Sequence, residues 1–172
     1  MRRLAFFDFA TLFDKQGAAE AHPRAASDVL GELITSRRLF HYNVRVRKDV
    51  ERLILQARRD LENARKNIGI GAYEVTAFLS HQAVEKYLKA AWMHRKGARP
   101  PATHYLKELG DGLGVPNALA SKLLYLNPDY TVARYPDAAN GVPYELYDET
   151  IARAKVEAAE ELAGWVESLI RS

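Results

Sequence analysis

Residues 72–94 read AYEVTAFLSHQAVEKYLKAAWMH, and this stretch decides the fold. Its apolar side chains, from Tyr73 and Val75 to Ala91 and Trp92, fall on nearly every side of a helical projection. A helix that is apolar all round is buried among several neighbours. We therefore expect residues 72–94 to form the central helix of a bundle.

The segment before it predicts a helix that packs against the first. Apolar residues recur there at steps of three and four, the spacing of an amphipathic helix: Val50, Leu53, Ile54, Ala57, Leu61, Ala64 and Ile68. Gly69 and Gly71 supply the tight turn that ends this helix. The two helices are therefore expected to run antiparallel.

The second half of the chain predicts shorter helices and then one long helix. Thr103 is a candidate N-cap for a helix that Gly110–Gly114 breaks, and a further helix runs over 116–126. A loop rich in Pro, Asp, Gly and Tyr covers 128–143, and Asp148 is a suitable N-cap for the last helix. The predicted fold class is all-α, an antiparallel up-down bundle of four to five helices over 48–172.

Residues 1–47 are expected to form an irregular N-terminal extension. They hold an apolar cluster between Leu4 and Phe13, and their alternating pattern at 39–47 predicts a short strand. Two explanations stay open: a lineage-specific extension, or an upstream start codon assigned in error, so that Met1 is not the native start.

Composition narrows the class of protein. A chain of 172 residues with 48% hydrophobic and 27% charged residues has the length and character of one globular domain. The absence of cysteine excludes disulfides, thiol catalysis and Cys-based metal sites. Because no apolar run approaches the length of a membrane span, we expect a cytoplasmic protein without a membrane partner. The five scattered histidines suggest no metal site, and no cofactor is expected.

Charge is unevenly distributed along the chain. Residues 48–104 carry 11 Lys or Arg against 6 Asp or Glu, and residues 105–172 carry 6 against 11. A basic segment can contact nucleic acid. An equally acidic segment in the same chain favours pairing of the two segments within the bundle or across a homodimer.

One polar stripe stands out on the predicted central helix. At 100° per residue, Gln82, Glu85, Lys86 and Lys89 fall within an arc of about 100°. The stripe is either a solvated face with a Glu85–Lys89 pair, or a face in a cleft where two ammonium groups meet phosphate. His81 lies beside it.

The sequence resembles a known family at this helix and around it. The strings RRDL at 58–61, GAY at 71–73 and HQAVEKYLKA at 81–90 resemble the first two helices of the HEPN domain, named for nucleotide binding in higher eukaryotes and prokaryotes. PATH at 101–104 and RYPD at 134–137 are similar to later landmarks of that family, in the same order. The resemblance covers about residues 48–171.

The resemblance implies a homodimeric bundle that binds a nucleotide or RNA. Prokaryotic members often work with a separate minimal nucleotidyltransferase in toxin-antitoxin-like pairs, so that protein is an expected partner. The candidate ligand-binding residues are His81, Gln82, Glu85, Lys86, Lys89, His104, Arg134 and Tyr135. A module that only docks on a protein partner is the alternative.

One branch of the family cleaves RNA without a metal, using Arg and His separated by four to six residues near a late helix. Arg99 and His104 have this spacing but precede the expected region, and no His follows Arg134. His104, Arg134 and Arg99 are therefore the candidates for an alternative function, a metal-independent endoribonuclease.

Arg134 and Tyr135 also have two interpretations. An Arg beside a Tyr can present a bidentate phosphate donor and an aromatic platform. Alternatively, an ion pair between Arg134 and Asp137 closes the loop. His104 follows a candidate N-cap, so it either lies near a helix N-terminus that attracts anions or packs in the capping turn.

Overall fold

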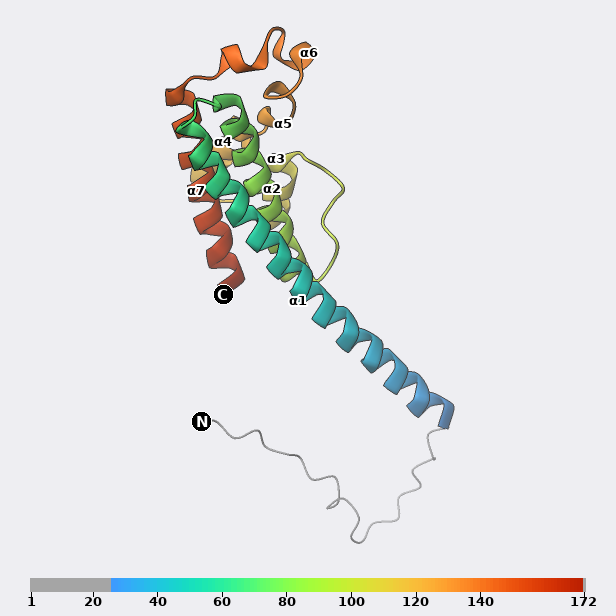
Figure 1. Ribbon diagram of the computed structural model, residues 1–172. Helices are drawn as coiled ribbons and strands as arrows, with labels where there is room; N and C mark the ends of the chain where they lie inside the picture. The colour runs from blue at the N-terminus through green and yellow to red at the C-terminus, as the bar shows by residue number, and fades with distance from the viewer. Residues whose placement is uncertain (1–25, 172) are drawn as a thin grey trace. The chain divides into compact units, whose positions relative to one another are not determined.

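The computed structural model describes residues 26–171, with side chains described at 31, 34–36 and from Arg47 onward (Figure 1). The chain divides into two units, residues 1–37 and 38–172, and the account below concerns the second unit. In chain order the elements are α1 (Ala26–Ile68), α2 (Tyr73–Lys96), α3 (Leu106–Leu113), α4 (Asn117–Leu126), α5 (Asp129–Val132), α6 (Pro136–Ala139), the 3-10 helix η1 (Pro143–Leu146) and α7 (Glu149–Arg171).

The expected all-α class is confirmed, because no strand occurs among the described residues. Five helices have eight residues or more, which agrees with a bundle of four to five helices. None of the described helices combines the length and the apolar character that crossing a bilayer requires.

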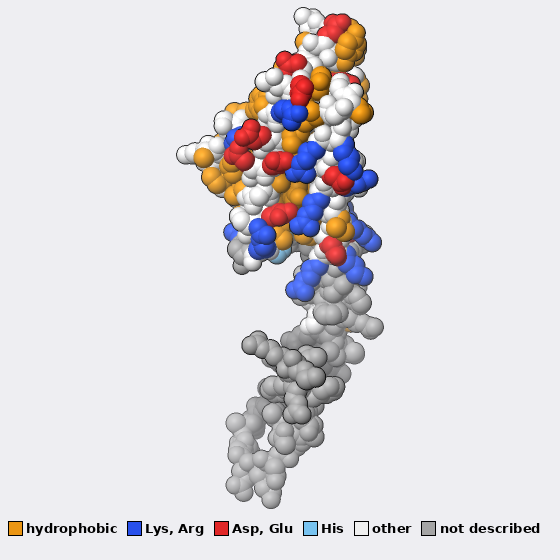
Figure 2. Space-filling view, turned by 60° about the vertical axis from the view of Figure 1, so that its left-hand side comes forward, with side chains coloured by type: hydrophobic (Ala, Val, Ile, Leu, Met, Phe, Trp, Pro, Cys, Tyr) orange, Lys and Arg blue, Asp and Glu red, His pale blue; other side chains and the backbone are white. Residues whose placement is uncertain are grey.

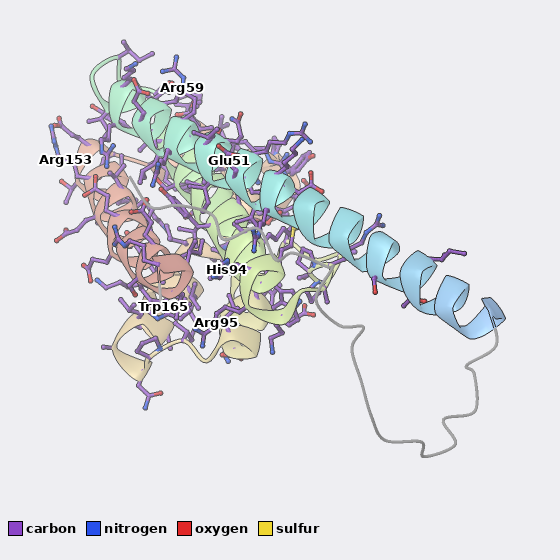
Figure 3. The ribbon with its side chains drawn as sticks, turned by 90° about the horizontal axis from the view of Figure 1, so that it is seen from below. Glu51, Arg59, His94, Arg95, Arg153 and Trp165 are labelled. Carbon is purple, nitrogen blue, oxygen red and sulfur yellow. The ribbon has the colours of Figure 1, made fainter. Side chains whose placement is uncertain are left out.

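Helix α2 packs against both α1 and α7, as its apolar sequence predicts (Figures 1 and 3). Leu61 of α1, Leu88 of α2 and Leu162 of α7 belong to one buried apolar cluster. Burial of such side chains contributes about 1.5–3 kcal/mol each. The core therefore sits around α2, where all its neighbours meet.

Ion pairs join the basic and acidic segments of the chain. Arg58 lies 2.9 Å from Glu167 and Arg65 lies 2.6 Å from Glu160, so α1 and α7 run antiparallel. The uneven charge distribution is thus accounted for in part by pairing within the bundle. Figure 2 shows Lys and Arg side chains interspersed with Asp and Glu over one face.

Glycines inside α3 permit close packing. The sequence predicts a break over Gly110–Gly114, and α3 runs to Leu113 and ends at Gly114, which has φ 73°. A Cβ atom on Gly112 would lie 2.2 Å from the Trp92 ring. The helix thus ends within the predicted range, at its last glycine, while Gly112 lets α3 approach α2.

Two predictions for the N-terminal region are wrong. Residues 39–47 are helical rather than a strand, and α1 begins at Ala26 rather than near Lys48. Alternation alone does not make a strand without a partner strand, whereas each residue added to an existing helix gains a hydrogen bond. The apolar cluster of residues 4–13 lies outside the described residues.

The helix starts follow the expected capping in one case of two. Asp148 accepts a hydrogen bond from the Ile151 backbone N–H at 2.7 Å, as expected for the N-cap of α7. The Thr103 hydroxyl oxygen, however, accepts a hydrogen bond from the backbone N–H of Tyr105 and does not cap α3. The side chain of Asn127 instead accepts the N–H of Leu106 at 2.8 Å, so a residue of a later turn caps α3.

A buried ion pair fixes α5 against α7. Asp129 of α5 is 2% exposed, and its carboxylate lies 2.7 Å from Lys155 Nζ of α7. The Tyr147 hydroxyl donates to the same carboxylate at 2.8 Å, and Lys155 donates to the Tyr125 carbonyl at 2.6 Å. These contacts hold α5, and with it Tyr130, in one place.

Replacing Lys155 with Met keeps an unbranched side chain but removes the ammonium group. Asp129 then stays buried without its counter-charge, so we expect the free energy of unfolding to fall by about 3–5 kcal/mol. Urea denaturation followed by tryptophan fluorescence measures the loss.

Lys122→Met is the matched control for that variant. Lys122 joins α4 to Glu161 of α7 at 2.7 Å, but both side chains are partly exposed, and removing such a pair costs less than about 1 kcal/mol. Equal losses in the two variants would contradict a special role for the buried pair.

Candidate functional site

The polar stripe of α2 faces neighbouring elements of the protein, so it is neither fully solvated nor an open cleft. The side chain of Glu85 is 7% exposed, and those of Lys86 and Lys89 are 23% and 20% exposed. Gln82 is half-buried beside them. Each lysine is held by a carboxylate that is more deeply buried than itself.

Asp60 of α1 holds Lys86. Its carboxylate lies 2.8 Å from Lys86 Nζ and accepts a hydrogen bond from Gln56 at 2.7 Å. Lys86 also donates to the Gln82 side-chain oxygen at 3.0 Å. Sequence analysis missed Asp60 as part of the site, although a carboxylate between Ala57 and Ala64 on the apolar face of a helix is an unusual feature that could have revealed it.

Glu85 is the centre of the network. It accepts hydrogen bonds from Lys89 at 2.7 Å and from His104 Nδ1 at 3.0 Å. Burial alone would raise the pKa of Glu85, but the hydrogen bonds from Lys89 and His104 outweigh it and lower the pKa. Glu85 is therefore ionised and orients the His104 ring, whose side chain is 54% exposed.

His81 is a structural residue in this arrangement. It is fully buried, and its Nε2 lies 3.1 Å from the His104 carbonyl oxygen. Because a carbonyl only accepts, Nε2 carries the proton and donates it. Burial lowers the pKa of His81 to about 4, so the ring is neutral at pH 7. His81 thus holds the loop 97–105 against α2.

Tyr130 joins His104 to Arg134. The rings of His104 and Tyr130 are stacked, with centroids 4.1 Å apart and planes 12° from parallel. The Arg134 guanidinium carbon lies 4.4 Å from the Tyr130 ring, 4.6 Å from Phe78 and 4.9 Å from Tyr135. We call these five residues the aromatic–arginine surface.

Arg134 has no ion pair among the described residues. Its Nε donates to the Tyr130 carbonyl at 2.7 Å, and the expected alternative, an Arg134–Asp137 ion pair, is not formed in this part of the chain. Arg134 and Tyr135 are both exposed. The terminal nitrogens of Arg134 are therefore available to an anion, above a floor of aromatic rings.

Arg99 lies apart from His104 despite their short separation in sequence. No hydrogen bond or ion pair joins the two residues, and Arg99 lines a pocket with Lys86, Leu53 and Met93. Contacts connect all eight of the other candidate residues into one region, and Arg99 lies at its edge. The eight are His81, Gln82, Glu85, Lys86, Lys89, His104, Arg134 and Tyr135. Within residues 26–171, no three His, Asp or Glu side chains converge as a metal site.

Sequence analysis missed Phe78 and Tyr130 as members of the aromatic–arginine surface. Tyr130 lies four residues before Arg134, the separation of neighbours on a helical turn, and that spacing could have indicated the contact. Nothing in the sequence placed Phe78 of α2 against the later loop, because that contact depends on where α5 docks.

Comparison with known proteins gives a matching family model and similar crystal structures. A family model described as HEPN domain matches residues 50–169. The crystal structure of an archaeal HEPN homologue is similar at 36% sequence identity and a TM-score of 0.61, covering 70% of this chain and 97% of its own. No protein of curated function is similar enough to be counted as a relative.

Two bacterial crystal structures are similar as well. One is a protein from Thermus thermophilus, with 27% identity, a TM-score of 0.65, and coverage of 70% of this chain and 97% of its own. The other is a HEPN domain protein from Thermotoga maritima, with 26% identity, a TM-score of 0.57, and coverage of 70% and 98%.

The fold and site define a small helical-bundle domain whose central helix carries a buried polar network. The match to the family model and the archaeal homologue identify it further: the chain belongs to the HEPN domain family.

The buried neutral His81 makes stability depend on pH. The unfolded chain takes up a proton at His81 near pH 6.5, but the folded protein does so only near pH 4. The contribution of His81 to the free energy of unfolding is therefore fully present above pH 6.5. It falls by up to about 1.4 kcal/mol per pH unit as the pH drops toward 4.

His81→Gln should flatten this part of the pH profile, since Gln can still donate to the His104 carbonyl but does not titrate. Urea denaturation at several pH values measures the slope. The exposed His94 provides the control, because His94→Gln should keep the wild-type slope. An unchanged slope in His81→Gln would contradict the assignment.

Proposed function

We propose that the aromatic–arginine surface binds a nucleotide or a single-stranded RNA segment. The observation that carries this proposal is the position of Arg134, whose exposed guanidinium lies over three aromatic rings and has no carboxylate partner in the described chain. A guanidinium contacts phosphate through two parallel hydrogen bonds. Exposed rings such as Tyr135 and His104 give a base a surface on which to stack.

The lysines of the stripe take a secondary part in this proposal. Lys86 and Lys89 are each paired with a buried carboxylate, so a phosphate must compete with Asp60 or Glu85 for them. Arg134 has no such competitor in the part of the chain that the structure describes. The ligand is therefore expected to depend more on Arg134 than on either lysine.

Membership of the family supports two finer proposals. The protein is proposed to form a homodimer, and to work with a minimal nucleotidyltransferase in a toxin-antitoxin-like pair. Both rest on the resemblance of the chain to prokaryotic members, and co-purification with the product of a neighbouring gene tests the second.

Arg134→Ala should weaken binding of a fluorescently labelled single-stranded RNA by about tenfold or more, as expected when a hydrogen bond to a charged group is lost. Arg134→Lys should restore only part of the affinity, because an ammonium group lacks the planar, forked geometry. Fluorescence anisotropy at fixed low salt gives the dissociation constants.

Arg59→Ala is the matched control. Arg59 projects from α1 away from α2 and α7 in Figure 3, and its ion pair is with Glu62 of the same helix. The control removes the same charge as Arg134→Ala. Equal losses in the two variants would mean nonspecific electrostatic binding and would overturn the proposed surface.

The contact between Glu85 and His104 favours a second candidate function, metal-independent RNA cleavage. By accepting the proton of Nδ1, Glu85 leaves Nε2 of the exposed ring free to act as a base. In such a step Nε2 takes the proton of a ribose 2′-hydroxyl, the 2′-oxygen attacks phosphorus, and the 5′-oxygen leaves. Arg134 would hold the charged phosphate.

This candidate predicts RNA cleavage in the presence of EDTA that His104→Ala abolishes and His94→Ala leaves unchanged. Gel analysis of end-labelled RNA detects the products. Persistent cleavage by the His104→Ala protein would remove His104 from the mechanism, and intact RNA with the wild-type protein would leave binding as the function.

A further inference from the structure

The pocket that Arg99 lines lies at the other end of the loop that carries His104. It has a volume of about 470 Å³ and is formed by α1, the end of α2 and the start of the loop 97–105. Sites for small molecules span about 300–1,000 Å³, so the pocket has the size of one small ligand. It contains none of the five residues of the aromatic–arginine surface.

The wall of this pocket is mainly apolar. Leu53 from α1, Met93 from α2 and Pro100 from the loop supply its floor. Met93 belongs to a small buried cluster with Val50 and Ala90, which fixes its position. A methionine sulfur forms favourable contacts with aromatic rings. The floor therefore suits a planar apolar body.

Cationic groups surround the floor. Arg99 is exposed and has no hydrogen bond or ion pair in the described part of the chain. Arg52 has a side chain that is 77% exposed and lies 3.2 Å from Asp49. Lys86 completes the set. Asp49 also lines the pocket and pairs with Arg52, and Lys86 is paired with Asp60, so Arg99 is the cationic group of the lining that has no carboxylate partner in the described part of the chain. A guanidinium group matches the geometry of phosphate.

Asp60 holds the polar part of the wall in place. This carboxylate, 6% exposed, accepts a hydrogen bond from Gln56 and pairs with Lys86, and both of these partners line the pocket. A site whose polar groups are fixed before binding loses less conformational entropy when a ligand arrives. The pocket thus has a built polar side as well as an apolar floor.

We propose that this pocket binds a small aromatic phosphate, with its ring against Leu53, Met93 and Pro100 and its phosphate at Arg99 and Arg52. The combination of an apolar floor and an unpaired arginine at the rim carries the proposal. A nucleoside monophosphate and a simple aryl phosphate share this chemistry. The inference does not rest on the aromatic–arginine surface, since none of the five residues of that surface lines the pocket; only Lys86 takes a secondary part in both proposals.

Calorimetric titration of the full-length protein with AMP and with phenyl phosphate tests the proposal. Adenosine lacks the phosphate and inorganic phosphate lacks the ring, so both should bind at least about tenfold more weakly than AMP. Tighter binding of AMP than of phenyl phosphate identifies a nucleotide as the ligand, and the reverse identifies a simple aryl phosphate. No binding of either compound at up to about 1 mM would overturn the proposal.

Variants then locate the ligand. Arg99→Ala should weaken AMP binding by about tenfold or more, and Arg59→Ala, on the same helix as Arg52 but outside the pocket, should not. Thermal unfolding of both variants confirms that they fold, and both changed side chains are exposed.

Arg134→Ala separates this proposal from the proposed function. AMP binding that survives Arg134→Ala but not Arg99→Ala supports the pocket, whatever happens to RNA binding. AMP binding that is lost in Arg134→Ala and kept in Arg99→Ala would place the nucleotide on the aromatic–arginine surface and overturn the pocket. Equal affinity for AMP and inorganic phosphate would also overturn it, because the apolar floor would then contribute nothing.

Discussion

The whole candidate site depends on the buried carboxylate of Glu85. A carboxylate that is 7% exposed is costly to desolvate, and hydrogen bonds from Lys89 and His104 offset that cost. The hydrogen bond from His104 also fixes the loop 97–105 along α2, and His81 holds the loop backbone by donating to the His104 carbonyl. Tyr130 stacks on the His104 ring that is held in this way, and the Tyr130 ring in turn contacts the Arg134 guanidinium. Without this carboxylate, His104 would lose the hydrogen bond that holds its ring, and with it the support for Tyr130 and Arg134.

Two further carboxylates follow the same pattern. Asp60 ties α1 to Lys86 of α2, and Asp129 ties α5 to Lys155 of α7. Replacing such a buried pair with apolar groups is often neutral for stability, whereas removing one partner is strongly destabilising. We therefore interpret the three pairs as fixing which residues meet between elements, while the leucine and alanine core supplies the free energy of folding. Positions of functional side chains depend on such fixed pairs more than on the core, because apolar packing alone tolerates small shifts.

Local sequence patterns predicted the helices, and tertiary contacts determined the site. The periodicity of residues 48–68 and 72–94 is a property of each helix alone, so it could be predicted from the sequence, as could the common face of Gln82, Glu85, Lys86 and Lys89. Which neighbour covers that face depends on the path of the loop 97–105 and on the docking of α5. Asp60 comes from α1 and Tyr130 from α5, and Phe78, although it is part of α2, meets Arg134 only where α5 docks, so the part of these residues in the site could not be deduced from one helix. The strand predicted at 39–47 failed for the same reason, since a strand needs a partner that the pattern does not reveal.

One backbone segment links the two proposed ligand-binding regions. The loop 97–105 carries Arg99 at the pocket and His104 at the aromatic–arginine surface, and between them Pro100 and Pro101 restrict the backbone. A ligand that restrains one end of a loop lowers the entropy that a ligand at the other end must still remove. Such coupling is reciprocal, so an aromatic phosphate that favours RNA binding would itself be bound more tightly in the presence of RNA, by the same factor. The hydrogen bond from His104 to Glu85 already anchors one end of the loop, so the entropy that a ligand can still remove lies mainly at the other end, at Arg99.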